Sequence, residues 1–170
     1  TLIMGPTQLA FSANGINLVN VTTADEMYSA CIDKFKEADI TIMSAAVADY
    51  TPINKADEKI KKKEGSLNVE LTKTKDILKA LGEKKKKGQI LVGFALETNN
   101  EEAFANQKLK EKNADLIVLN SLNDTGAGFG YDTNKITIFE RGGKVYKFET
   151  KSKSEVAKDI IDTITQLYYA

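Results

Sequence analysis

The sequence predicts a Rossmann-like three-layer α/β domain with a mainly parallel sheet and a C-terminal β-hairpin followed by a helix. Apolar, strand-like runs alternate with amphipathic segments along most of the chain, and this alternation is typical of a parallel sheet covered by helices on both faces. Near the end, two strand-like runs flank Gly142-Gly143, which predicts a hairpin. The length of 170 residues fits one domain. We therefore expect a single domain over residues 1–170.

The first predicted unit has the order strand, helix, strand. Residues 17–21 alternate like a strand, and Thr23 with Glu26 then forms a capping box for a helix that runs to about Ala38. The β-branched apolar run 39–45 predicts a buried strand.

A long segment, 46–66, carries Pro52, Gly65 and several lysines and is expected to be a loop, too long for a simple connection. A short strand at 67–71 follows. Thr74 is then expected to cap a helix that buries Ile77, Leu78 and Leu81 and frays into the lysine run 84–87.

The second half continues the alternation. Residues 90–96 form the most apolar predicted strand, residues 100–113 a polar helix with Phe104 and Leu109 inward, and residues 116–119 the next strand. A glycine-rich loop over 120–133 leads to the hairpin strands 135–140 and 144–149. Ser152 and Glu155 form a second capping box ahead of a strongly amphipathic closing helix.

Composition excludes several classes of function. Hydrophobic residues make up 42% and charged residues 28% of the chain, and Lys plus Arg equals Asp plus Glu at 24 each. No positive excess is present to drive non-specific binding to nucleic acid or an acidic membrane. There is no histidine, which excludes Ser-His-Asp and Cys-His nucleophile systems and zinc sites that need imidazole. We expect neither a nucleic-acid nor a membrane partner.

The lone cysteine, Cys31, cannot form an intramolecular disulfide. The sequence shows neither a signal peptide nor an 18-residue apolar run, so we expect a reduced, cytoplasmic protein. Cys31 lies at helical spacing with Met27 and Phe35, which favours a core residue over a reactive thiol.

Two glycine-rich runs do not match nucleotide-binding fingerprints. In 126–130 the third glycine is misplaced for G-x-G-x-x-G, and the loop opens onto a hairpin instead of a helix. The run 82–88 lacks the Lys-Ser or Lys-Thr of a P-loop and ends a helix where a P-loop would begin one. An NAD-dependent oxidoreductase on this fold therefore has no fingerprint to support it.

Two other segments each allow two interpretations. Residues 44–50 place small side chains and the acidic Asp49 at the end of a strand, which suits a nucleotide base and ribose as well as tight packing with a turn residue. The lysines in 59–63 are either a solvated charge cluster, the usual meaning of such a run, or a phosphate-binding segment.

Five segments, taken together and in order, resemble phosphopantothenoylcysteine synthetase, also called phosphopantothenate cysteine ligase, the ligase half of the bacterial bifunctional coenzyme A biosynthesis protein. They are AAVADY at 45–50, EKIKK at 58–62, VGFALETNN at 92–100, QKLKEKNADLIVLN at 107–120, and the Gly-Phe-Gly loop before Asp132 and Asn134. The resemblance runs from about Thr1 to Leu167.

The resemblance implies a two-step ligation that uses CTP. The carboxylate of 4'-phosphopantothenate attacks the α-phosphate to give an acyl cytidylate and pyrophosphate, and the amine of cysteine then displaces CMP. Neither step needs histidine, because lysines and a Mg²⁺ ion can neutralise the phosphates. The resemblance also implies a homodimer with the site near its interface, and fusion to a flavin-dependent decarboxylase domain. It assigns no metal ligand.

The resemblance implies a catalytic role for Lys59, the first lysine of the K-x-K-K run, and a substrate contact or loop cap for Asn120. Nucleotide contacts are implied for Ala45, Asp49, Lys59, Lys75, Asp76, Ile77, Leu78, Phe94, Lys108 and Lys112. Backbone groups near Ala45 and Phe94 would read the cytosine. A core position for Phe94 and solvent exposure for the lysines are the competing interpretations.

The sequence departs from the family at its start. Members ordinarily begin with a strand and a glycine-rich turn that opens the first helix, whereas residues 2–6 look like the family's second strand and the turn after it. We therefore expect residues 1–170 alone to bind CTP weakly and not to form the amide. The main alternative from another class is a non-catalytic nucleotide-binding domain.

Overall fold

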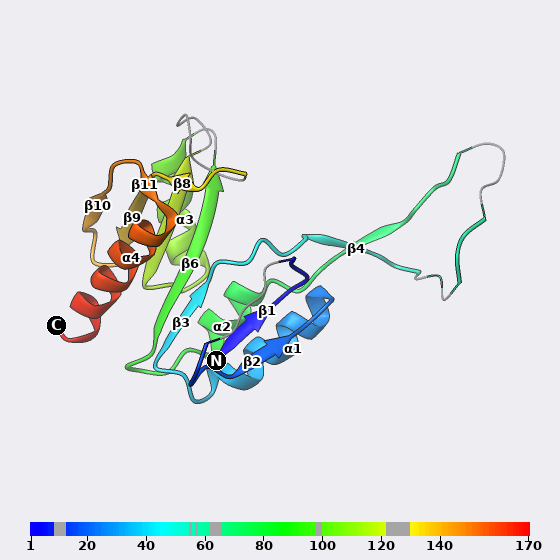
Figure 1. The fold of residues 1–170 in the computed structure, drawn as a ribbon, viewed down its shortest axis with the longest axis horizontal. Helices are drawn as coiled ribbons and strands as arrows, with labels where there is room; N and C mark the ends of the chain where they lie inside the picture. Colours follow the sequence, from blue (N-terminus) through cyan, green and yellow to red (C-terminus); the bar gives the residue numbers. More distant parts are fainter. Residues whose placement is uncertain (9–12, 55, 57, 62–65, 98–99, 122–129) are drawn as a thin grey trace. The chain divides into compact units, whose positions relative to one another are not determined.

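The computed structural model describes the chain except for residues 9–12, 55, 57, 62–65, 98–99 and 122–129. It divides into two compact units (Figure 1). The arm unit comprises Thr1–Asp33 and Ala45–Ile77, and the sheet unit comprises Lys34–Ser44 and Leu78–Ala170. The expected single domain stays a prediction.

The sheet unit is built on a five-stranded sheet. Its strands lie in the order β10 (Val145–Lys147), β9 (Ile136–Glu140), β7 (Leu116–Ser121), β6 (Ile90–Glu97) and β3 (Ile40–Met43). β3, β6 and β7 run parallel, and β9 and β10 are antiparallel. This arrangement confirms the mainly parallel sheet and the C-terminal hairpin, whose turn holds Gly143 at a φ of 90°.

Helices cover both faces of this sheet (Figure 1). On one face α4 (Lys153–Tyr168) packs Val156, Ile160 and Ile164 against side chains of β6, β7 and β9. On the other, α3 (Glu101–Glu111) packs Ala105 and Leu109 against the second row of the same strands. Each large apolar side chain buried in this way contributes about 1.5–3 kcal/mol. The predicted three-layer α/β architecture is confirmed.

Two expectations about the core are wrong. Phe104 was expected inside, but its side chain is 45% exposed, and the inward stripe of α3 is formed by Ala105 and Leu109, four residues apart. The run 39–45 was expected to be a buried strand, but β3 ends the sheet with β6 as its partner, and Ile40 and Ile42 are exposed.

In the arm unit, β1 (Leu2–Met4) and β2 (Leu18–Asn20) pair in parallel, and α1 (Ala24–Phe35) follows. The predicted capping box is present, because the Glu26 N–H donates to Thr23 Oγ1 and Glu26 Oε2 accepts from the Thr23 N–H, both at 3.2 Å. Cys31 is buried, and burial raises the pKa of its thiol, which confirms the core interpretation.

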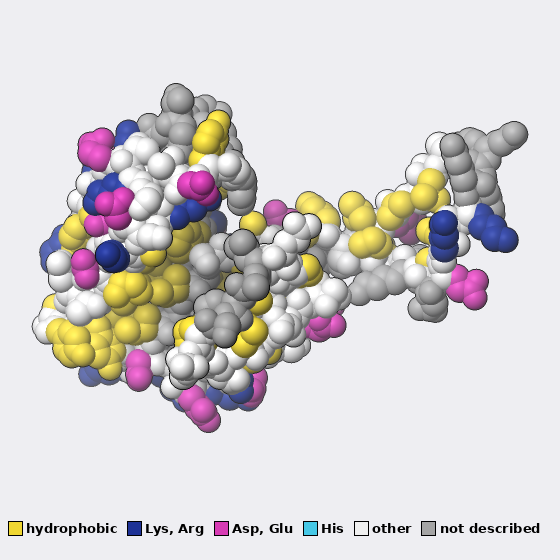
Figure 2. All heavy atoms as spheres, viewed as in Figure 1, with side chains coloured by type: hydrophobic (Ala, Val, Ile, Leu, Met, Phe, Trp, Pro, Cys, Tyr) yellow, Lys and Arg dark blue, Asp and Glu magenta, His cyan; other side chains and the backbone are white. Residues whose placement is uncertain are grey.

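The segment expected as a loop and a short strand contains an antiparallel ribbon, and the described residues from 50 to 73 are here called the arm. β4 (Tyr50–Pro52) pairs with β5 (Leu71–Lys73), so the first strand lies where a loop was predicted and the second begins at the last residue of the predicted strand. Pro52 is compatible with this ribbon because the ribbon has only two strands, and each leaves one edge unpaired. Figure 1 labels β4, and Figure 2 shows hydrophobic side chains along the described part of the arm.

The start of α2 (Ile77–Lys84) also differs from the prediction. Thr74 does not cap this helix. Its hydroxyl donates to the Ala48 carbonyl at 2.7 Å instead.

One short strand precedes the hairpin and another follows it. β8 (Thr133–Asn134) pairs antiparallel with β11 (Lys151–Ser152), directly before α4. The predicted capping box of α4 is present in both directions between Ser152 and Glu155. Within the described part of the chain, none of the helices is long and apolar enough to cross a bilayer.

Candidate nucleotide and substrate site

The residues expected to form the site fall into both units. Ala45, Asp49, Lys59, Lys75, Asp76 and Ile77 belong to the arm unit, and Leu78, Phe94, Lys108, Lys112 and Asn120 belong to the sheet unit.

Two of the expected nucleotide segments meet in the arm unit. Thr74 joins them, because its backbone N–H donates to the Asp49 carbonyl at 2.9 Å and its hydroxyl to the Ala48 carbonyl. The turn at 45–49 is therefore fixed beside the residues that precede α2, although the two segments are 26 positions apart. Ala45 and the Asp49 side chain are exposed.

Lys75 reaches toward α1. Its Nζ lies 3.1 Å from Asp25 Oδ1 and 5.0 Å from the centre of the Tyr28 ring. Both charged side chains are more than half exposed, so this pair contributes little to stability and could be exchanged for a ligand. Ile77 is a core side chain, so only its backbone N–H, at the start of α2, remains for an anion.

In the sheet unit, the structure joins two of the predicted nucleotide residues. Lys108 Nζ on α3 donates to the Phe94 carbonyl on β6 at 2.9 Å. The Phe94 ring is partly buried and packs against the core under α4. The Phe94 side chain therefore packs in the core, which was one of its two predicted positions, and its backbone carbonyl accepts the hydrogen bond from Lys108.

Lys112 stands one helical turn after Lys108. Its backbone N–H donates to the Lys108 carbonyl at 3.0 Å, and both lysines are half-buried. The predicted spacing is confirmed, whereas a shared ligand stays a prediction. Leu78 packs against the core under α3, beside Gly93 of β6.

Asn120 lies near the carboxyl end of β7 and has a partner that the sequence did not reveal. Its Oδ1 accepts a hydrogen bond at 3.0 Å from Nδ2 of Asn134, a buried residue on β8. Asn134 belongs to a motif of the family resemblance, but no role was predicted for it.

Lys59 lies exposed on the arm. Lys62 and Lys63, and the glycine-rich run 126–129, lie outside the described residues. The catalytic role of Lys59 stays a prediction.

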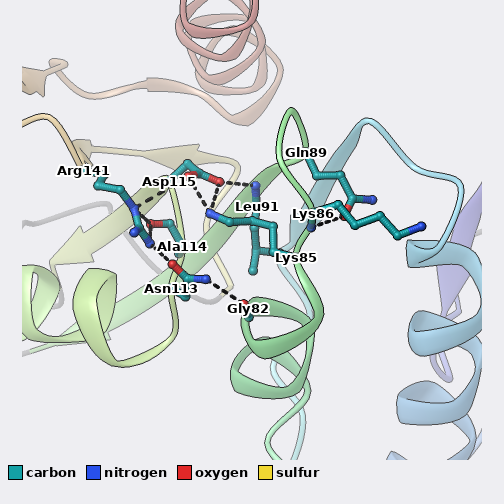
Figure 3. Close-up of polar contacts among 9 residues, drawn as sticks. All are labelled: Gly82, Lys85, Lys86, Gln89, Leu91, Asn113, Ala114, Asp115 and Arg141. Atoms are coloured by element: carbon teal, nitrogen blue, oxygen red, sulfur yellow. Dashed lines mark hydrogen bonds and ion pairs between the residues drawn. The ribbon is translucent and has the colours of Figure 1, made fainter.

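A second polar cluster lies at the amino ends of the parallel strands (Figure 3). Both carboxylate oxygens of Asp115 accept from Lys85 Nζ, at 2.6 and 2.7 Å, and one also accepts from the Leu91 N–H at 2.8 Å. Arg141 Nε lies 3.7 Å from the same carboxylate. The helix α2 ends at Lys84, as the lysine run 84–87 predicted, and the next lysine, Lys85, is buried in this cluster with a side chain that is only 10% exposed.

A cavity of about 740 Å³ opens beside this cluster and is lined by Arg141, Leu167 and Tyr168 among others. The residues expected to bind nucleotide do not line it. Among the described residues, there is also no group of three or more His, Cys, Asp or Glu side chains placed to hold a metal ion.

Comparison with known proteins places the chain in a family. The profile of the DNA/pantothenate metabolism flavoprotein C-terminal domain matches residues 1–168. The chain is 51% identical over 169 residues to a protein of an unknown prokaryotic organism named cysteine/cysteine sulfinic acid decarboxylase, and the match covers 99% of the chain and 47% of that protein. It is 45% identical over 166 residues to the coenzyme A biosynthesis bifunctional protein CoaBC of Bacillus subtilis, covering 98% of the chain and 41% of that protein.

The chain thus spans less than half the length of these two relatives. Among solved structures, the C-terminal domain of a coenzyme A biosynthesis bifunctional protein CoaBC superposes with a TM-score of 0.79 at 38% identity, over 97% of this chain and 72% of that one. These matches confirm the resemblance carried by the five motifs, and the chain belongs to the family of DNA/pantothenate metabolism flavoprotein C-terminal domains.

Proposed function

We propose that this chain provides the domain that ligates 4'-phosphopantothenate with cysteine, using CTP, in coenzyme A biosynthesis. The observation that carries the proposal is the 45% identity to Bacillus subtilis CoaBC over 98% of the chain, a range that includes the segments of all five motifs. The remainder of that longer relative has room for the flavin-dependent decarboxylase domain that the resemblance implies.

The proposed chemistry needs charge neutralisation more than proton transfer. A carboxylate oxygen of 4'-phosphopantothenate attacks the α-phosphorus of CTP, and the bond to pyrophosphate breaks. The cysteine nitrogen then attacks the acyl carbon, loses its proton, and the bond to CMP breaks. Cationic side chains can stabilise the charge that moves onto pyrophosphate and CMP.

Lys108 is suited to this role by its present partner. Its ammonium group donates to a neutral backbone carbonyl, that of Phe94. A hydrogen bond between an ammonium group and a phosphate oxygen is charge-assisted at both ends and therefore stronger. An entering nucleotide phosphate would take the lysine from the carbonyl with little reorganisation, since the lysine is already positioned.

The donor set is compatible with a magnesium ion that enters with the nucleotide. Mg²⁺ is commonly held by substrate phosphates with one or two protein carboxylates. Within the described ranges there is no three-acid cluster, and the exposed carboxylate of Asp49 could supply one ligand. When bound, the ion would neutralise phosphate charge.

A second copy of the chain is part of the proposal. The arm exposes Tyr50, Ile53, Ile60, Leu67, Val69 and Leu71. Large apolar side chains gathered on one exposed ribbon mark an interaction surface. We expect sedimentation to give the mass of a dimer, and a monomer after replacement of Leu67 and Val69 by serine. A monomeric wild-type chain would overturn the dimer.

Nucleotide binding is tested on the 170-residue chain by isothermal titration and thermal shift with CTP, ATP and NAD, each with Mg²⁺. A ligand that binds only the folded state raises its apparent stability. We expect CTP to bind more tightly than ATP, and NAD not to bind. Equal or better affinity for ATP would overturn the choice of CTP and leave a nucleotide-dependent ligase.

Ligation is tested in a chimera in which this chain replaces the matching 166 residues of the Bacillus subtilis protein. With CTP, Mg²⁺, 4'-phosphopantothenate and cysteine, mass spectrometry should find 4'-phosphopantothenoylcysteine. Parallel reactions contain cysteine or cysteine sulfinic acid but no nucleotide. They test for decarboxylation, because one relative is named as a decarboxylase of these two compounds. Decarboxylation without ligation would contradict the proposed function.

A further inference from the structure

We infer that Asn134 is a positioning residue that fixes the side-chain amide of Asn120, so that Asn120 presents hydrogen-bond donors to an acceptor oxygen of the substrate. This inference rests on the proposed function, in which Asn120 contacts substrate. The two residues lie on different strands, β7 and β8, fourteen positions apart.

The orientation of Asn134 follows from a backbone group. The Lys135 N–H donates to Asn134 Oδ1 at 3.0 Å. Because a backbone N–H can only donate, the side-chain atom facing it must be the oxygen, and the amide nitrogen must point the other way. That nitrogen lies 3.0 Å from the Asn120 side chain.

The same reasoning fixes Asn120. The atom that faces Asn134 Nδ2 must accept, so it is Oδ1 of Asn120. The Nδ2 group of Asn120 then points away from Asn134 with its two N–H donors. An asparagine alone could offer either end of its amide, and the pair selects the donor end.

Asn134 is held firmly enough to impose this choice. It is only 8% exposed. Its strand pairs with β11, where Lys151 stands opposite Asn134 and Ser152 opposite Thr133. Ser152 is also the N-cap of α4. Reversing the Asn134 amide would set a donor against the Lys135 N–H and an acceptor against Asn120 Oδ1, and unpaired buried polar groups are costly.

The chemical consequence is a preference for substrate groups that only accept hydrogen bonds. Phosphate and carboxylate oxygens of 4'-phosphopantothenate belong to this class. An ammonium group at the same place can only donate, so it would meet N–H groups and find no acceptor. The pair thus makes the carboxyl end of β7 a site that donates hydrogen bonds.

The test is made in the chimera and reads the KM for 4'-phosphopantothenate separately from kcat. Asn134→Asp keeps the acceptor for the Lys135 N–H but puts a second acceptor against Asn120, which must turn and offer its oxygen to the substrate. We expect KM to rise about tenfold or more, the scale of a lost hydrogen bond to a charged group. Asn120→Asp, which also offers only acceptors, should give a similar rise.

Non-additivity separates positioning from general damage. If Asn134 acts through Asn120, then Asn134→Ala adds no further rise in KM in an Asn120→Ala background. The matched control is Asn113→Ala, which removes an amide that donates to the Gly82 carbonyl at 2.7 Å in the cluster of Figure 3. It should lower thermal stability and leave KM unchanged.

A readout without activity is the side-chain amide spectrum of the isotopically labelled 170-residue chain. The Asn134 NH₂ should be protected from exchange in the wild type, and the Asn120 NH₂ should shift when 4'-phosphopantothenate is added and become protected in Asn134→Asp. If that variant does not fold, Asn134→Ala replaces it, with a smaller expected rise in KM. An active wild type whose KM is unchanged by these variants would overturn the inference. An inactive wild-type chimera would overturn the proposed function and with it the role of this pair.

Discussion

The two ends of the sheet in the sheet unit use polar side chains in opposite ways. At the amino ends of the strands, Asp115 accepts from Lys85 and from the Leu91 N–H, with Arg141 close by. At the carboxyl ends, Asn120 has one side-chain oxygen engaged, and Lys108, from α3, is held on β6 by a single neutral carbonyl.

We expect this difference to separate polar groups that stabilise the fold from those that bind a ligand. A carboxylate that already accepts three short hydrogen bonds from the protein, as Asp115 does, has little capacity left for a ligand and mainly stabilises the fold. Among the described residues, Lys108 has one neutral partner and the side-chain N–H groups of Asn120 have none, so both have capacity left for a ligand. Ligands of parallel α/β sheets bind beyond the carboxyl ends of the strands, in agreement with this division.

The largest expected effect is at the amino ends of the strands, where Asp115 lies. Asp115→Ala leaves the Lys85 ammonium, 10% exposed, without its carboxylate and the Leu91 N–H without its acceptor. Removing one member of a buried ion pair costs about 3–5 kcal/mol. We expect urea denaturation to show a loss of this order in the free energy of unfolding.

The matched control for Asp115→Ala is Asp25→Ala, which breaks the exposed pair with Lys75. It should cost about 1 kcal/mol or less. Similar losses of unfolding free energy in the two variants would show that the cluster around Asp115 is no different from an ordinary surface ion pair.

The next effect concerns Lys59, an exposed lysine of the arm. In the chimera, Lys59→Ala is expected to lower the ligation rate on the order of 10²-fold, the scale of one preorganised charge donor. The free energy of unfolding should barely change, because an exposed lysine contributes little to the core. Pyrophosphate release with both substrates present measures the rate.

Lys61→Ala is the matched control for Lys59, since it is also exposed on the arm. We expect it to retain most of the rate. Unchanged turnover in Lys59→Ala would contradict the catalytic role and favour the other interpretation of this lysine run, a solvated charge cluster.

A smaller effect is expected for Lys108. Lys108→Ala should weaken CTP binding about tenfold or more, since a hydrogen bond to a charged group is lost. Its bond to the neutral Phe94 carbonyl is half-exposed, so the loss in unfolding free energy should be about 1 kcal/mol. Isothermal titration measures the affinity, and Lys110→Ala, exposed on the same helix, is the control. A loss of stability without a loss of affinity would show that Lys108, like the cluster around Asp115, stabilises the fold and does not bind the nucleotide.

Much of the fold was predictable because its signals are local. The capping boxes at Thr23 and Ser152 lie within four residues of the groups they bind, and both are present. The apolar run 90–96 forms β6 almost residue for residue. Hydrophobic periodicity and capping are properties of short windows, so the sequence displays them directly.

The errors arose where partners are distant in the sequence. Lys85 and Asp115 are 30 positions apart, so nothing near Lys85 distinguishes a buried lysine from a solvated one. The ribbon pairs β5 with β4, a strand inside the stretch 46–66 that was predicted as a loop because of its proline, glycine and lysines. The bond between Asn120 and Asn134 also depends on how two strands return beside each other. An asparagine two residues after Asp132 in a recognisable motif was the only available signal.

The smallest expected effect is a pH dependence at the N-terminus of α4, which follows the strand paired with β8. The Ser152 hydroxyl donates to Glu155 Oε2 at 2.6 Å and the Ser152 N–H to the same oxygen at 3.1 Å. These bonds lower the pKa of Glu155 below its ordinary value of 4.5. A carboxyl whose pKa is lower in the folded state stabilises the fold above its unfolded pKa and loses this contribution as pH falls through the folded value. The stability difference between wild type and Glu155→Gln should therefore be present at pH 7 and shrink below about pH 4.5. Urea denaturation at pH 7 and pH 3 measures it, with Glu149→Gln as the control.

The same variant tests how far the carboxyl-end site extends. Because this cap supports the strand that carries Asn134, a rise in the KM for 4'-phosphopantothenate in Glu155→Gln at pH 7 would extend the carboxyl-end site to the start of α4. An unchanged KM would confine that site to the asparagine pair and Lys108.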